Sequence, residues 1–321
     1  MFARFDAETV AQLTANGLFA GSAYGLLGVG FALILGVTGR FHFAYSFTYT
    51  FAAYMAYTLT FRGLELPFWP AALLGILVAT ALGVFIERFI YRSLVRRAGA
   101  TALLAVFVAA LGIGIAGQNI IALLWSQQSQ PYFGPGKKAW ALWKVRFENF
   151  AVWQVVSAVV LVAILVALLR FTGLGRAIKA TRVNPELATI IGINANLIYL
   201  VCFGIGTFLA GVAAFWQGLR FAIEPAMGQR PVIFAFVVAF LAGTARSPVR
   251  VFLTGVIVGV VEQLASIWLS VRWTETTVFV ILVGYLVSLS VRGRRLSELL
   301  PFLRPAAGDP PAAPTTPAVG S

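Results

Sequence analysis

The sequence predicts an all-α membrane protein, a polytopic helical bundle of about 8–10 spans with one polar helix on its cytoplasmic side. Hydrophobic residues make up 60% of the chain and charged residues 11%, with a mean hydropathy of +0.89. Soluble domains average about 45–50% apolar and about 25% charged residues. A spanning helix needs about 20 apolar residues, and segments of that kind recur along nearly the whole chain.

Nine apolar segments are expected to form helices. Long apolar runs favour helices over a β-barrel, whose strands are shorter and alternate between apolar and polar residues. We divide the chain into an N-terminal segment at 1–15, one transmembrane domain at 16–300 and a disordered Pro/Ala-rich tail at 301–321. The apolar segments are 16–37, 43–61, 67–87, 101–125, 151–170, 197–219, 231–245, 249–271 and 275–291.

Small residues in these segments are spaced for close helix packing. Gly21 and Gly25 are four residues apart, and so are Gly255 and Gly259, a spacing that brings helix backbones together in membranes. The sequence GIGIAG at 112–117 also matches a dinucleotide-binding fingerprint, but that motif requires a preceding strand. Because GIGIAG lies within an apolar span, we interpret its glycines as packing residues too.

The net charge of +13 suits either a nucleic-acid-binding protein or a membrane protein with basic cytoplasmic loops. If the polar segment at 172–196 is cytoplasmic, alternation of the spans places 38–42, 88–100 and 246–250 on the same side. Together with the C-terminal region and Arg170, these segments hold most of the 24 basic residues. The bias favours a multi-pass protein surrounded by the lipid bilayer, with no nucleic-acid partner.

Several kinds of chemistry have no motif in this sequence. No G-x-x-x-x-G-K-[S/T] loop occurs, so no ATP site of that type is expected. His42 is the one histidine, which excludes H-E-x-x-H and histidine-cluster metal sites, and no G-x-S-x-G motif accompanies it. We therefore expect no enzyme activity, no catalytic residues, no metal site and no cofactor bound by this chain.

Charged residues at membrane depth need a reason, because each costs about 2.5–3.5 kcal/mol on insertion scales. Glu262 lies about halfway along its predicted span, where it either forms an interhelical hydrogen bond or lines a solute pathway. Glu87 lies at a span end beside Arg88, where an interfacial ion pair is expected. Arg220 and Glu224 flank an outer loop, and they either pair there or face an entering solute.

The stretch 36–54 has a polar break followed by alternating aromatic residues: Phe41, Phe43, Tyr45, Phe47 and Tyr49. A broken helix around a water-lined cavity has this pattern, because irregular backbone at membrane depth occurs in such places. A cytoplasmic turn with an aromatic belt has it as well. The residues leave both interpretations open.

The segment GLGRAIKATRVNPELATIIGIN, at 173–194, is polar and yet predicted to be helical. Asn184 is typical of an N-cap, with Pro185 at the first helical position and Glu186 near the positive end of the helix. We predict two short helices that meet at Val183-Asn184, either as a docking knob or as a solvated amphipathic loop. Three basic residues are spaced to share one solvated face: Arg176, Lys179 and Arg182.

Four stretches resemble the permease subunits of branched-chain amino acid ABC transporters. The polar segment matches a recurring cytoplasmic pattern of that family at Gly173, Gly175, Arg176, Ala177, Lys179, Ala180, Ala188, Gly192 and Ile193. ERFIYRSLVRR at 87–97 and FLAGTARSPVRVFLTGVIVGVVEQL at 240–264 resemble two further segments, the second with the family's glutamate at Glu262. The N-terminal stretch matches at Asn16, Gly17, Gly21, Tyr24, Gly30, Gly36, Gly39, Phe43, Ala44, Ala53 and Tyr54.

The resemblance implies the transmembrane permease subunit of an ATP-driven solute importer in the bacterial inner (plasma) membrane. The implied partners are ABC ATPase subunits that use the ATP, a second permease subunit (the same or related) and a periplasmic solute-binding protein. The loop at 172–196 would be the coupling helix that contacts the ATPase, through Arg176, Lys179, Arg182, Asn184, Glu186 and Gly192. The substrate pathway would include His42, Phe43, Tyr45, Phe47 and Glu262.

Two departures from the family pattern concern the solute. Tyr45-Ser46-Phe47 replaces a polar stretch, and His42 stands where relatives carry Asn. A glycine-rich tract has become Ala-Gly-Thr-Ala-Arg-Ser at 242–247. A branched-chain amino acid, urea, an amide and an aromatic acid all stay open as solutes. The alternative function is a secondary carrier or facilitator for a small organic solute, without ATP coupling.

Overall fold

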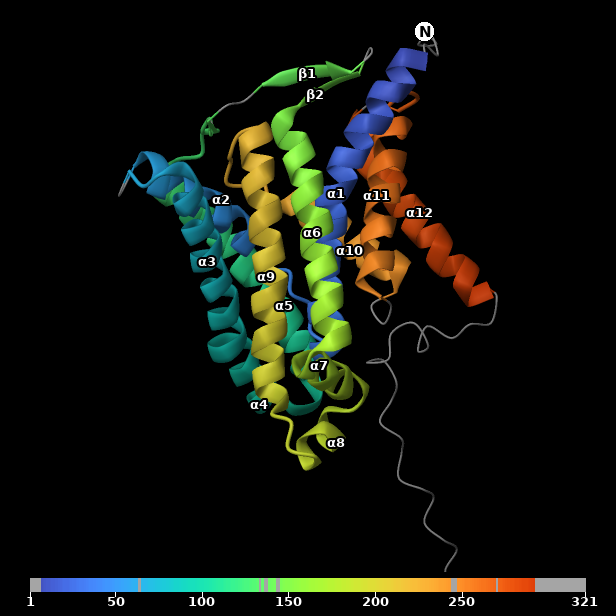
Figure 1. Cartoon of the computed structure of the whole chain (residues 1–321). Helices are drawn as coiled ribbons and strands as arrows, with labels where there is room; N and C mark the ends of the chain where they lie inside the picture. The colour runs from blue at the N-terminus through green and yellow to red at the C-terminus, as the bar shows by residue number, and fades with distance from the viewer. Residues whose placement is uncertain are drawn as a thin grey trace, which may run out of the picture.

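Helices make up most of the computed structural model, which confirms the all-α fold class (Figure 1). The structure describes residues 7–62, 65–132, 134–135, 138–142, 145–243, 247–269 and 271–291. The predicted tail at 301–321, the first six residues of the N-terminal segment and the family-like residues 244–246 lie outside the described residues.

Each of the nine apolar segments expected from the sequence forms a helix. A short antiparallel hairpin separates α5 from α6 along the chain: β1 (Ala139–Leu142) pairs with β2 (Val145–Glu148), with Trp140 opposite Phe147. The helices are α1 (Ala7–Thr38), α2 (Tyr45–Phe61), α3 (Phe68–Phe85), a π-helical turn (Ile86–Tyr91), α4 (Arg92–Ala98), a 3₁₀ turn (Gly99–Thr101), α5 (Ala102–Trp125), α6 (Asn149–Phe171), α7 (Gly173–Val183), α8 (Pro185–Ile190), α9 (Ala195–Arg220), α10 (Gln229–Ala242), α11 (Pro248–Ala265) and α12 (Val271–Val291).

Six helices of the described chain are long and apolar enough to cross a membrane. The remaining expected segments form α2, α10 and α12. At 1.5 Å per residue, the 14 residues of α10 reach only about 21 Å, less than the roughly 30 Å hydrocarbon core. The six long helices are Ala7–Thr38, Phe68–Ala98, Ala102–Trp125, Asn149–Phe171, Ala195–Arg220 and Pro248–Ala265.

Helix α1 is the centre of the bundle and packs against α9, α10 and α11. It meets α11 through the two predicted glycine pairs: a Cβ added to Gly21 would lie 2.7 Å from the Val256 backbone. This contact confirms the close approach expected from the spacing. The interpretation of GIGIAG holds only in part, because Gly117 lies beneath the Phe47 ring, whereas no described atom lies within 4 Å of a Cβ at Gly112.

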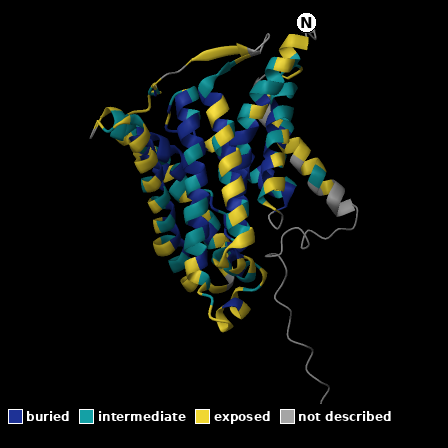
Figure 2. Ribbon diagram, viewed as in Figure 1, coloured by how far each residue is buried: buried dark blue, intermediate teal, exposed yellow. Residues whose placement is uncertain are grey.

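Exposed apolar side chains cover the outward faces of α3, α5 and α6, whereas buried residues gather on α1, α2, α9 and α10 (Figure 2). Leu123 on α5 is 86% exposed, and Leu74 on α3 and Ile164 on α6 are exposed as well. Soluble monomeric proteins rarely expose apolar surface of this extent to water. Lipid or another membrane protein covers these faces.

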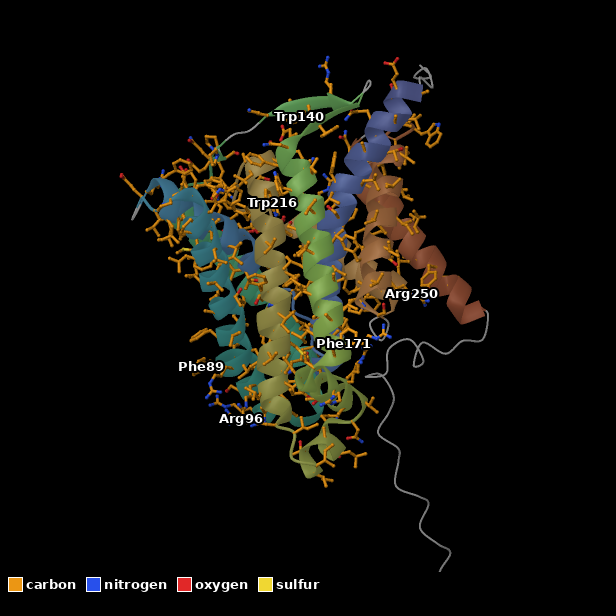
Figure 3. All side chains as sticks on the ribbon, in the orientation of Figure 1. Phe89, Arg96, Trp140, Phe171, Trp216 and Arg250 are labelled. Carbon is orange, nitrogen blue, oxygen red and sulfur yellow. The ribbon has the colours of Figure 1, made fainter. Side chains whose placement is uncertain are left out.

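The two ends of the bundle differ. The start of α1 and the β1–β2 hairpin lie at one end, and α4, α7 and α8 lie at the other (Figure 1). Two hydrogen bonds of 2.8 Å join the Gln12 side chain to the Arg146 backbone and fix the hairpin on α1. We call these the hairpin end and the α8 end; Trp140 marks the first and Arg96 lies near the second (Figure 3).

Candidate functional site

The polar segment folds into two short helices, α7 and α8, as the sequence predicts. The side-chain oxygen of Asn184 accepts hydrogen bonds from the backbone N–H groups of Glu186 (2.9 Å) and Leu187 (3.0 Å). Pro185 occupies the first turn, where its missing N–H costs nothing. The predicted junction at Val183-Asn184 and the N-cap are confirmed, and Glu186 is an exposed residue of the first turn.

The end of α8 is closed by a glycine turn. Gly192 has φ +86°, a backbone conformation that favours glycine, and no described atom lies within 4 Å of a Cβ there. The N–H of Ile193 donates to the Ala188 carbonyl at 2.9 Å, and the N–H of Gly192 donates to Thr189 at 3.0 Å. This pattern ends the helix and turns the chain directly into α9.

The prediction that Arg176, Lys179 and Arg182 share a solvated face holds for the first two residues and is wrong for Arg182. Arg176 and Lys179 are exposed, but Arg182 is partly covered, and its burial lowers the pKa of the guanidinium from the ordinary value. The reason is that α7 packs onto the bundle through Ile178, which is buried against a cluster of residues from α1 and α9. Position on a helical wheel does not reveal which side of a short helix a neighbouring element covers.

An apolar surface, which we call the knob, occupies the α8 end instead. Val183 is 87% exposed and Ile190 79% exposed, and Leu187 and Ile191 are exposed beside them. Val183 ends α7, whereas Leu187, Ile190 and Ile191 belong to α8 and its C-cap, so the two short helices form this surface together.

The break between α1 and α2 is a buried turn. His42 is fully buried, with its Nδ1 atom 2.9 Å from the Tyr91 hydroxyl and its ring centroid 4.9 Å from that of Phe203. The Tyr45 hydroxyl donates to the Gly206 carbonyl at 2.8 Å. These polar groups therefore bind other helices of the bundle, which accounts for an irregular backbone at this depth.

The two predicted pathway phenylalanines of this stretch are half-buried. The ring centroid of Phe43 lies 5.4 Å from that of Phe107 and 6.3 Å from that of Phe31. Phe47 packs against Phe51, with centroids 5.7 Å apart, and over Gly117. The assignment of His42, Phe43, Tyr45 and Phe47 to a solute pathway stays a prediction.

Glu87 does not pair with its sequence neighbour Arg88, contrary to expectation. It lies in the π-helical turn and forms a buried ion pair with Arg40 of the α1–α2 break. The Arg40 guanidinium also lies over the Tyr199 ring, 5.1 Å from its centroid. One ion pair thus joins the break, the turn after α3 and the first turns of α9.

A cavity of about 730 Å³ opens between α1, α2, α9, α10 and α11 at the hairpin end. Glu262 is the one predicted pathway residue among those that line it, and Tyr49 of the aromatic stretch lines it too. The lining residues are Asn16, Ala20, Ala23, Tyr24, Tyr49, Ser129, Gln217, Arg220, Phe221, Ala222, Glu224, Ala226, Met227, Arg230, Pro231, Glu262, Gln263 and Ser266.

Glu262 makes the interhelical contact that was one of its two expected roles, and its place on a solute pathway stays a prediction. It lies in the last turn of α11, which ends at Ala265, and not halfway along a span. Its carboxylate is 2% exposed and accepts a hydrogen bond of 2.6 Å from Arg230 on α10. The residue therefore forms an interhelical ion pair and also belongs to the cavity wall.

Residues 13–289 match the family described as branched-chain amino acid transport system / permease component. The chain belongs to that permease family. With six helices able to cross a membrane, this permease is a multi-pass membrane protein, and its relatives are transporter subunits and not enzymes.

The relatives match the permease over most of their length. The high-affinity branched-chain amino acid transport system permease protein BraD of Pseudomonas aeruginosa is 30% identical over 287 residues, covering 85% of this chain and 91% of BraD. The LivH proteins of Salmonella typhimurium and Escherichia coli are each 28% identical, covering 84% of this chain and 90% of LivH. PsaBC from Streptococcus pneumoniae in complex with Fab has a TM-score of 0.49 and 14% identity, with 88% and 95% of the two chains covered.

The cavity wall also contains Arg220 and Glu224, expected either to pair or to face a solute, and Arg230, which no sequence pattern singled out. Arg220 ends α9, and its guanidinium lies 5.7 Å from the Phe19 centroid and 5.1 Å from that of Phe221. Arg230 begins α10 and holds Glu262. Both lie within the segment GLRFAIEPAMGQRP at 218–231, but only the fold shows that they converge on one cavity with Glu262.

Proposed function

We propose that the permease is the translocating subunit of an ATP-driven importer, coupled through the knob to a separate ATPase. The observation that carries this proposal is the exposure of Val183, Leu187, Ile190 and Ile191 at the tip of the bundle. Helix α8, which carries Leu187 and Ile190, lies beyond the long helices, so lipid tails do not cover it (Figure 1). Exposed apolar residues rimmed by polar ones are typical of a protein-binding surface.

Charge supports a cytoplasmic position for the knob. The elements next to it carry Arg92, Arg96, Arg97, Arg176 and Lys179, and Lys and Arg accumulate on the cytoplasmic side of membrane proteins. The hairpin end then faces outward, where a periplasmic solute-binding protein delivers the solute. In this proposal the permease lies in the inner membrane and its ATPase partner consumes the ATP.

The relatives suggest the solute class. BraD and LivH are both named as high-affinity branched-chain amino acid transport permeases. A small organic solute with an apolar body is therefore the working assignment for this permease. The second permease subunit of the assembly, the same or related, binds one of the exposed apolar faces that run along the bundle.

Disruption of the knob tests the coupling. The Ile190→Glu variant places a charge in the centre of the knob, and we expect it to lose co-purification of the ATPase subunits while its own membrane level stays normal. The matched control is Trp140→Glu, a change of equal kind at an exposed position on the opposite end. Equal ATPase recovery with both variants would overturn the proposal.

A further inference from the structure

We propose that Arg230 binds a carboxylate group of the transported solute inside the cavity at the hairpin end. This inference rests on the proposed transport function and names the chemistry that the permease selects. Neither the family match nor the relatives' names assign a role to Arg230 or to the cavity. The three observations that carry the proposal are the size of the cavity, the way Arg230 is held, and the remaining walls.

The cavity has the dimensions of a ligand site. Its volume of about 730 Å³ lies within the roughly 300–1,000 Å³ usual for small-molecule pockets. It is formed by the C-terminal ends of α9 and α11, the first half of α1 and the start of α10. Because these elements meet at the hairpin end, a solute arriving from that side enters the cavity before it reaches the centre of the bundle.

Arg230 is fixed in position but remains open to the cavity. Glu262 accepts from its Nη2 atom at 2.6 Å, and Glu262 itself is almost completely buried. The guanidinium carbon lies 5.8 Å from the Phe234 ring, which in turn stacks on Tyr24 at 4.5 Å. Even so, 43% of the Arg230 side chain is exposed. A planar guanidinium presents five donors in a fixed fork, so one carboxylate can orient it while a second one binds.

The other walls suit a solute that has a carboxylate and an apolar body. Arg220 adds a second guanidinium to the lining, and Glu224 adds an exposed carboxylate that can accept from an ammonium group. Tyr24, Tyr49 and Met227 supply apolar surface. A neutral diamide such as urea offers the two arginines only a neutral carbonyl acceptor, whereas a carboxylate forms charge-assisted, bidentate hydrogen bonds with a guanidinium.

Cysteine protection measures binding in this cavity directly. The full permease with Ser266→Cys, co-expressed with its ATPase and kept without ATP, is labelled in membranes by N-ethylmaleimide, a neutral thiol reagent. The native Cys202 is buried elsewhere and lies in a different cluster. L-Leucine and benzoate are added as carboxylate probes, with L-leucinamide and urea as matched probes that have no carboxylate.

We expect at least one carboxylate probe to slow labelling, by about tenfold when it is present at ten times its dissociation constant, and the two other probes to have no effect. Protection by leucine alone identifies a zwitterionic solute; protection by benzoate alone identifies an aromatic acid. Both results support the proposal. If neither leucine nor benzoate slows labelling, or if leucine and leucinamide slow it equally, the proposal is overturned.

Variants assign the effect to Arg230. Arg230→Gln should remove protection without changing the labelling rate in the absence of probe. Because the buried Glu262 carboxylate then lacks its ion-pair partner Arg230, the double variant Arg230→Gln/Glu262→Gln provides a neutral pair for the same measurement. Arg146→Gln, an exposed arginine outside the cavity lining, should keep full protection. Protection that persists in both Arg230 variants would contradict the proposal.

The outcome is separable from that of the proposed function. The labelling assay uses no ATP and requires no transport, so carboxylate protection would stand even if solute uptake proved independent of the ATPase. Conversely, ATP-driven uptake without carboxylate protection would leave the coupling proposal intact and remove Arg230 from the solute site.

Discussion

Arg40 donates to the Glu87 carboxylate across the interior of the α8 end, joining the α1–α2 break to the π-helical turn that follows α3. Both side chains are almost fully buried. Removing one partner of a buried ion pair leaves an uncompensated charge, whereas removing both does not. The pair therefore fixes the arrangement of three elements: the break, the turn after α3 and, through Tyr199, the start of α9.

The ion pair should behave as a unit. We expect Glu87→Leu alone to destabilise the permease by about 3–5 kcal/mol, because Arg40 stays buried without this partner, and Arg40→Met/Glu87→Leu to recover much of the loss. Thermal unfolding of the purified protein in detergent, followed by tryptophan fluorescence, measures the difference. A double variant as unstable as the single one would show that the two charges act independently.

Helix α1 should tolerate no side chain at its contact with α11. Gly21→Ala places a methyl group 2.7 Å from the Val256 backbone, which cannot move aside as a flexible side chain would. Overpacking of this kind typically costs about 1–3 kcal/mol. The matched control is Gly112→Ala on α5, where the new methyl group meets no described atom within 4 Å. Equal melting temperatures for the two variants would refute the close packing.

Tyr45 tests whether the aromatic stretch lines the solute pathway. Because its ring is fully buried and its hydroxyl binds the Gly206 carbonyl, we expect Tyr45→Phe to lower stability by about 1 kcal/mol. Competition of leucine and benzoate for uptake should be unchanged in this variant. A shifted competition profile at normal stability would instead support the sequence-based assignment of Tyr45 to the pathway.

The N-cap of α8 should matter for coupling. Asn184→Ala removes the acceptor for two backbone N–H groups, which costs about 0.5–2 kcal/mol of local helix stability. We expect less ATPase to co-purify, because the knob depends on a formed α8. Asn184→Asp keeps an acceptor oxygen at the same place and should restore binding. If alanine and aspartate give equal recovery, the cap has no part in docking.

The helices were predictable because each depends on neighbouring residues. Continuous apolar runs located the helices, and the order Asn184-Pro185-Glu186 located the boundary between α7 and α8 from capping chemistry alone. The four-residue spacing of the glycines within α1 and within α11 also predicted close helix packing. Each of these signals lies within one element.

The side-chain pairs between distant helices were not predictable, because they depend on tertiary packing. Glu87 binds Arg40, 47 positions away, and not the adjacent Arg88. Arg182 is partly covered because Ile178 attaches α7 to the bundle, and no property of the short helix indicates which side is attached. The cavity needed α1, α9, α10 and α11 in place before Arg230 and Glu262 could be recognised as parts of one site.

Solute uptake by the reconstituted complex tests directly whether transport is driven by an ATPase that binds the knob. Proteoliposomes containing the permease, its second permease subunit and the ATPase subunits are supplied with the binding protein loaded with radiolabelled leucine. We expect uptake that requires ATP on the knob side, is lost in Ile190→Glu and is kept in Ile190→Leu, which leaves the knob apolar. Uptake that proceeds without ATP, or that is equal in the two variants, would contradict this expectation and favour a carrier that works without an ATPase.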